Sequence, residues 1–190
     1  MALELGITDR IELIDTNPRD PAGGFWKTNP LGKIPALETD DGTVLFDSPV
    51  ICDYLAEEFG DRRLVAGDGR TAWQARTLAA LADGIMDAAM LVRLELMRPG
   101  SERSPADMAK QMATADRGFD RLETLLGGCD GTPDLGTIAA GCCIDWVMFR
   151  HPDTDWLGPR PSLAAWQERF AKRDSMRHTA PGRHLSWTGN

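Results

Sequence analysis

The chain has 190 residues, a formal net charge of −8 and 26% charged side chains. This length allows one large domain or two small ones with a substantial buried core. The acidic balance without a basic cluster argues against a nucleic-acid partner. There is neither an apolar run of membrane length nor a signal-peptide pattern, so we expect no membrane partner and a cytoplasmic protein.

Residues 1–15 carry two short patterns. Residues 1–7 are typical of the end of a helix, which Gly6 would terminate. From Arg10 to Asp15, polar and apolar side chains alternate, and this alternation predicts a strand.

A β-hairpin is predicted next, with strands at 34–39 and 43–46. The turn at 40–42 has the sequence Asp-Asp-Gly, and an Asp-Gly pair between two β-rich runs favours a hairpin because glycine adopts a positive φ without steric cost.

A helix is expected directly after the hairpin, with Ser48 as its N-cap, Pro49 at its first position and Gly60 at its end. The N-terminus of such a helix suits an anion, because its free N–H groups and its dipole both favour negative charge.

Beyond residue 70 the pattern is helical throughout. The helices are expected at 71–97, from a Ser104 N-cap to 126, at 134–149 and at 162–172. In the second of these helices the apolar side chains recur at three- and four-residue intervals, so one face should be buried. The helix at 134–149 is apolar on most sides and is therefore expected to be central. In the helix at 162–172, Leu163, Trp166 and Phe170 are expected to face inward. Asp134 and Thr137 are expected to cap the third of these helices reciprocally, although threonine is a weaker partner there than a carboxylate.

The cysteines Cys52, Cys129, Cys142 and Cys143 show neither CxxC spacing nor a zinc-site pattern. We therefore expect reduced, packed thiols and no metal. Cys129 lies in a glycine-rich loop, and it is expected to react through exposure.

The run from Asn29 to Leu37, followed by Phe46, Asp47, Ser48 and Pro49, closely resembles the glutathione-binding domain of soluble glutathione transferases, in particular the bacterial members. The resemblance extends through 81–84, 145–146 and 163–166 to about residue 180. It implies an α/β thioredoxin-like domain at 1–62, a linker at 63–70 and an all-α helical-bundle domain at 71–190, in a homodimer.

A domain of this family opens with a strand and a loop that carries the catalytic Ser, Tyr or Cys. Here the helix end at Gly6 comes almost at once. We therefore expect the N-terminal domain to be incomplete, through a misplaced start or a truncated product, with the catalytic residue upstream of Met1. A genuinely reduced variant is the alternative.

The resemblance also assigns residues to glutathione, which is γ-Glu-Cys-Gly. Ser48 would bind the γ-Glu carboxylate, and Asp47 and Asp83 its ammonium, with Asp83 reaching across from the partner subunit. Ile34 and Pro35, joined by a cis peptide bond in the family, would pair with the backbone of the peptide. Lys33 would reach the glycine carboxylate.

Each of these residues also has a plain structural interpretation. Ser48 would serve as a cap only, Lys33 would be a solvated loop lysine, and Asp83 and Asp87 would be exposed helix acids. The electrophile would bind between the domains, near Met86, Met90 and Arg93, although methionines at helical spacing are more often core residues.

The implied function is transfer of the glutathione thiolate, as co-substrate, to a small electrophile. The first alternative is a non-catalytic binding or scaffold protein of the same family. The second is a glutathione-dependent disulfide reductase, for which Cys52 is the nearby thiol.

Overall fold

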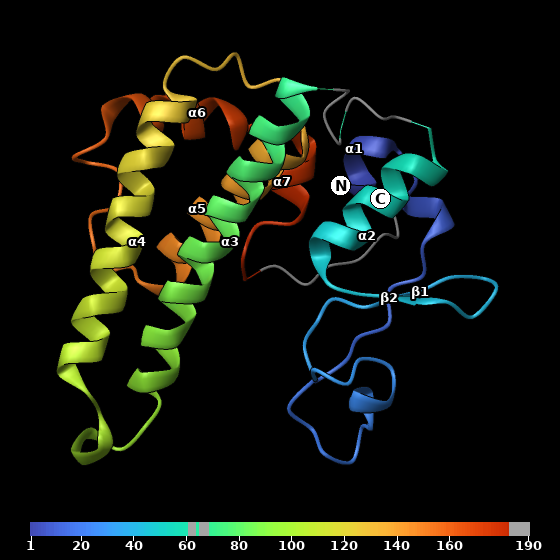
Figure 1. Ribbon diagram of the computed structural model, residues 1–190, viewed down its shortest axis with the longest axis horizontal. Coiled ribbons are helices and arrows are strands. Elements are labelled where there is room, and N and C mark those ends of the chain that lie inside the picture. The colour runs from blue at the N-terminus through green and yellow to red at the C-terminus, as the bar shows by residue number, and fades with distance from the viewer. Residues whose placement is uncertain (61–63, 65–68, 183–190) are drawn as a thin grey trace.

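The computed structural model describes residues 1–60, 64 and 69–182, which form a small N-terminal part with a two-stranded sheet and a larger helical part (Figure 1). The N-terminal part contains α1 (Ala2–Leu5), 3₁₀ turns at Thr8–Arg10 and Phe25–Lys27, β1 (Leu37–Glu38), β2 (Val44–Leu45) and α2 (Ser48–Glu58). The helical part contains α3 (Arg70–Leu96), a 3₁₀ turn at Gly100–Glu102, α4 (Pro105–Leu126), α5 (Leu135–Arg150), α6 (Pro161–Phe170) and α7 (Asp174–His178). This arrangement confirms the fold class expected from the sequence. The expected linker at 63–70 lies largely outside the described residues.

The predicted hairpin is present, with shorter strands than expected. β1 and β2 are antiparallel, and Leu37 pairs with Leu45. The Asp41 carboxylate stabilises the turn by accepting hydrogen bonds from the Thr39 hydroxyl at 2.6 Å and from the Thr43 N–H at 3.0 Å. These bonds lower the pKa of Asp41 to about 2, and the bond from Thr39 has the largest effect. Gly42 has the positive φ, 82°, that the turn requires.

The strand predicted at Arg10–Asp15 is wrong. Arg10 ends a 3₁₀ turn, and Ile11 after it is extended. Among the described residues only β1 and β2 pair. Ile11 packs partly buried against the apolar cluster of α1 and α2, whereas Leu13 is 40% and Ile14 78% exposed.

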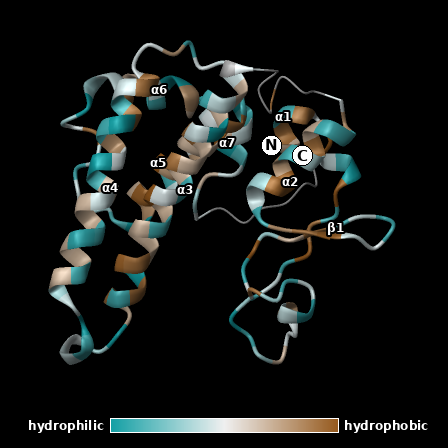
Figure 2. Cartoon of the chain, viewed as in Figure 1, coloured by the Kyte–Doolittle hydropathy of each residue, from teal (hydrophilic) through white to brown (hydrophobic). Residues whose placement is uncertain are grey.

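Hydrophobic residues gather in two places, along α3 and α5 and between α1 and α2 (Figure 2). α3 packs against both α4 and α5. The α3–α5 contact is very close at Gly136, where an added Cβ would lie 2.6 Å from the Ala75 carbonyl oxygen and 2.9 Å from the Leu78 Cβ. Only glycine allows the two backbones to approach this far.

The predicted caps of the helical part are confirmed. The Ser104 hydroxyl accepts from the N–H of Asp107 at 3.3 Å. At the start of α5, the Asp134 carboxylate accepts from the Thr137 N–H, and the Thr137 hydroxyl accepts from the Asp134 N–H, each at 2.8 Å. The short helix α7, which follows α6, was not predicted from the sequence.

α7 connects the two parts of the molecule. Arg173, which immediately precedes it, donates two hydrogen bonds to the Glu4 carboxylate at 2.7 and 2.9 Å, and the Ser175 hydroxyl donates a further one. The hydrogen bond from Arg173 is the main reason why the pKa of Glu4 is lowered, and the hydrogen bond from Ser175 lowers it further. α1 and α7 therefore lie side by side at the junction (Figure 1). None of the described helices is both long enough and apolar enough to cross a membrane.

Candidate functional site

The loop before β1 presents Lys33, Ile34 and Pro35 at the surface, and all three are exposed. The Ile34–Pro35 peptide bond is cis, as the resemblance implied. No other described residue hydrogen-bonds to the N–H or C=O of Ile34. The buried Asn29 holds this loop, because its amide donates to the Lys33 carbonyl at 2.7 Å and accepts from the Leu31 N–H at 3.0 Å.

Sequence reasoning missed this role of Asn29. An asparagine directly before a proline at the start of a loop is the signal that could have indicated it, since Asx side chains commonly bond to the backbone two residues on.

The first residue of α2 is Ser48, and its N-cap is Asp47. The expectation that Ser48 is the cap and Pro49 the first helical residue is therefore wrong by one position. Asp47 has the extended backbone of a cap, but its side chain makes no capping bond. Asp47 and Ser48 are both exposed, so the Ser48 N–H and hydroxyl and the Asp47 carboxylate remain available at a helix N-terminus, where an anion is favoured.

Asp83 lies half-buried on α3. Burial raises the pKa of its carboxyl, and the negative charges of Asp47 and then Asp87 raise it further. The structure thus brings Asp47 and Asp83 within electrostatic range of one another in a single chain. The role of Asp83 across a subunit interface, which the resemblance implied, stays a prediction. Two carboxylates that repel one another are a favourable place for a cation.

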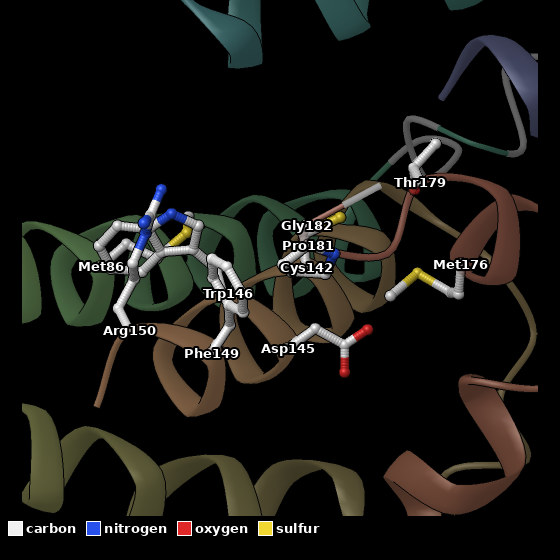
Figure 3. A pocket seen from close by; sticks show the side chains of 10 residues that line it. All are labelled: Met86, Cys142, Asp145, Trp146, Phe149, Arg150, Met176, Thr179, Pro181 and Gly182. Atoms are coloured by element: carbon white, nitrogen blue, oxygen red, sulfur yellow. The ribbon is translucent and has the colours of Figure 1, made fainter. Parts of the chain in front are cut away.

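A cavity of about 290 Å³ lies between α3, α5, α7 and the segment at 179–182 (Figure 3). The residues that line it are Met86, Cys142, Asp145, Trp146, Phe149, Arg150, Met176, Thr179, Pro181 and Gly182. Of the three linings expected from sequence, only Met86 is among them. Met86 follows Asp83 by three positions on α3, so both side chains lie on one face of the helix, about one turn apart.

Five of the lining residues come from α5, whose outer positions the sequence analysis did not assign to a site. The helix was interpreted as apolar on most sides and therefore central. The polar residues Asp145 and Arg150 within that apolar run were the available signal, because charged side chains in a buried helix require a partner or a function.

Family models identify the chain. The model for the glutathione S-transferase N-terminal domain matches residues 1–58, and the model for the C-terminal domain matches residues 72–169. The chain belongs to the glutathione S-transferase family. A GST-like protein of Escherichia coli K12, YibF, whose function is uncharacterised, is 34% identical over 186 residues, which cover 95% of this chain and 90% of YibF.

Solved structures of this glutathione S-transferase family agree. A glutathione transferase family member from Pseudomonas fluorescens Pf-5, with bound glutathione, superposes with a TM-score of 0.90 at 37% identity, over 96% of this chain and 91% of that one. A glutathione S-transferase from Methylobacterium radiotolerans, in complex with glutathione sulfonate, gives a TM-score of 0.88 at 30% identity, over 97% and 88% of the two chains.

The cysteines of this glutathione S-transferase family member are all unpaired. Burial raises the pKa of the Cys52 thiol, which is opposite to what a nucleophilic cysteine requires. Cys129 does not have the expected exposure. It is half-buried, its thiol donates to the Leu125 carbonyl, and burial raises its pKa. No group of three or more His, Cys, Asp or Glu at residues 1–60, 64 or 69–182 is placed to hold a metal ion.

Proposed function

We propose that this protein is a glutathione transferase, which binds glutathione at the N-terminal part and transfers its thiolate to a small electrophile in the cavity. One observation carries the proposal. Asp83, whose carboxyl is repelled by Asp47 beside the start of α2, lies three positions before Met86 of the cavity wall on α3. The two related proteins that hold glutathione or its sulfonate support it.

In this proposal the ends of glutathione are recognised by complementary charge. The Ser48 N–H and hydroxyl donate to the γ-Glu carboxylate. Asp47 and Asp83 accept from the γ-Glu ammonium, which relieves their mutual repulsion. Ile34 pairs its free N–H and C=O with the peptide backbone in the manner of an added strand, beside Pro35, and Lys33 approaches the glycine carboxylate.

The chemistry is attack of the thiolate on an electrophilic carbon. A carbon–sulfur bond forms and the leaving group departs with its bonding pair. The protein must stabilise the thiolate with a hydrogen-bond donor and hold it near the electrophile. No described residue is assigned as that donor.

The domain organisation that we propose is a domain at 1–62, a linker at 63–70 and a helical domain at 71–190. Two separate clusters of buried apolar residues support it, one centred on Ile51 and Leu55 and the other on α3 to α7. We further propose a cytoplasmic homodimer with a role in detoxification. Exposed apolar side chains near the end of α3, Leu91, Leu94, Leu96 and Met97, support a subunit interface there.

Isothermal titration calorimetry, with glutathione added to the protein, tests the site. We expect saturable binding, and Ser48→Ala should weaken it by about 10- to 100-fold, because a hydrogen bond to a charged group is worth roughly 1.5–3 kcal/mol. Ser101→Ala, at an exposed serine of the Gly100–Glu102 turn, should change nothing. Wild-type affinity in Ser48→Ala, or no binding to folded wild-type protein, would reject the site.

The pH dependence of binding tests Asp83. Its pKa is raised in the free protein, and only the ionised carboxylate attracts the ammonium. Affinity should therefore increase as pH rises through this raised value, and the bound ammonium should lower the pKa again, so that binding releases a proton.

Calorimetry in two buffers of different ionisation enthalpy measures this proton release. Asp83→Asn should abolish it, whereas Asp153→Asn, at an exposed acid, should leave it intact. If Asp83→Asn retains both the affinity and the proton release of the wild type, Asp83 is not part of the site.

Turnover separates the enzyme from a binding protein of the same family. Glutathione binding without conjugation of any electrophile would favour the non-catalytic alternative. The raised pKa of Cys52 weighs against a disulfide reductase that uses this thiol.

A further inference from the structure

Arg150 is the last residue of α5 and one wall of the cavity (Figure 3). Its guanidinium carbon lies 4.9 Å from the centre of the Phe149 ring and 5.9 Å from that of Trp146. The cation is thus held against the aromatic lining, and it is a charged group in an otherwise largely apolar space.

This guanidinium has no polar partner among the described residues. Its Nε is buried and makes no hydrogen bond, and no carboxylate of the described chain lies within ion-pair distance of it. Two other arginines behave differently, since Arg160 binds Asp116 and Asp120 and Arg173 binds Glu4. A buried donor without a partner is costly, and among the described arginines Arg150 has the buried side-chain nitrogen that lacks one.

The other charged residue of the cavity does not neutralise Arg150. Asp145 accepts a hydrogen bond from the Gln167 amide at 2.5 Å, on the side of α6. Burial raises the pKa of Asp145, and the hydrogen bond from Gln167 lowers it; no ion pair joins Asp145 to Arg150 among the described residues. Arg150 therefore remains available to an anion that enters from outside.

We infer that the cavity selects electrophiles that carry a carboxylate on an aromatic or similarly apolar body, with Arg150 as the residue that determines this specificity. The apolar body packs on Met86, Trp146 and Phe149, and the planar guanidinium binds the carboxylate through its N–H groups. This inference rests on the proposed transferase function and specifies its second substrate. With an aryl halide that carries such a carboxylate, the glutathione thiolate forms a bond to the aryl carbon. The carbon–halogen bond breaks with release of halide, and the carboxylate stays unchanged on Arg150.

Binding of an unreactive probe tests the inference without turnover. Calorimetric titrations of 3,5-dinitrobenzoate and of its methyl ester compare two ligands that differ in one charge. We expect the wild type to prefer the carboxylate, and Arg150→Gln to lose about tenfold or more of that affinity while the ester changes by less than about twofold. Arg150→Lys should fall between, because a lysine supplies the charge but not the planar fork.

The control is Arg121→Gln on α4, which removes one exposed positive charge outside the cavity; it should leave both affinities unchanged. An equal loss for the carboxylate and the ester in Arg150→Gln would show that Arg150 only packs the cavity, and would overturn the inference. So would a wild type that binds the ester as tightly as the carboxylate. Should Arg150→Gln fail to fold, the Arg150→Lys titrations and the wild-type comparison decide the question.

Steady-state kinetics then test whether the preference for the carboxylate over the ester in binding also appears in turnover. With glutathione as co-substrate, kcat/KM for 4-chloro-3,5-dinitrobenzoate should fall about tenfold or more in Arg150→Gln, and that for its methyl ester should change little. Calorimetric glutathione affinity should be the same in all variants. If glutathione does not bind but the carboxylate still does in an Arg150-dependent way, the transferase proposal fails and the anion site stands.

Discussion

Replacing Trp166 with alanine should lower the free energy of unfolding by about 3–5 kcal/mol, the usual cost of removing a large buried aromatic side chain. Trp166 is fully buried in the core of the helical part, and its ring stacks on Phe170 with a centroid distance of 4.6 Å. The measurement is urea denaturation followed by circular dichroism, at one fixed protein concentration because oligomerisation contributes to apparent stability.

Trp166→Phe should cost much less, below about 1.5 kcal/mol, because it keeps most of the apolar volume. Within residues 1–60, 64 and 69–182, the buried indole N–H of Trp166 has no hydrogen-bond partner, so its removal loses no bond there. Trp73→Ala, at a side chain that is 70% exposed, should change stability by no more than about 0.5 kcal/mol. Equal destabilisation by the alanine and phenylalanine substitutions of Trp166 would contradict the expectation that the retained apolar volume determines the cost.

Gly136→Ala should destabilise the protein by about 1–3 kcal/mol, because the added methyl group would meet the α3 backbone at Ala75 and overpack the α3–α5 contact. Gly84→Ala is the matched control within α3 itself. A Cβ there meets nothing within 4 Å, so the substitution should stabilise the helix by about 0.5–1 kcal/mol.

The same urea denaturation measures both variants. The Gly136 substitution should also weaken binding in the cavity, since separation of α3 from α5 moves Met86 away from the lining residues of α5. If the two glycine substitutions have the same sign, close approach of the backbones is not what requires glycine at position 136.

Local signals explain what the sequence predicted correctly. The hairpin depends on Gly42 and on side-chain bonds within a few residues, and the caps at Ser104 and Asp134 are equally local. The inward positions of α6, Leu163, Trp166 and Phe170, follow from helical periodicity, and all three are buried.

The errors occurred where contacts with distant parts of the chain decide the structure. Alternation at Arg10–Asp15 could not reveal that no strand lies beside it. α7 is short and is held by Glu4, more than 160 positions away along the chain, so periodicity within it carries little information. The start of α2 differs by only one residue, which is within the normal uncertainty of helix ends.

The candidate site likewise has one part that local sequence predicts and another that depends on contacts between distant segments. The residues assigned to glutathione, apart from Asp83, came from a resemblance in one short run, and the structure places Asp47 and Ser48 at a helix start. The cavity could not be predicted, because it joins α3, α5 and residues 179–182, and only the tertiary packing shows that these segments meet.

That division has an evolutionary consequence. The residues proposed to hold glutathione lie on the loop before β1, the start of α2 and one position of α3, whereas most of the cavity wall belongs to α5 and to residues 176–182. Under the proposed function, substitutions in the wall would therefore change which electrophile is accepted without altering the proposed co-substrate site. A fold arranged in this way would allow descendants of one gene to acquire new second substrates through few changes, with the residues proposed to bind the thiol left untouched.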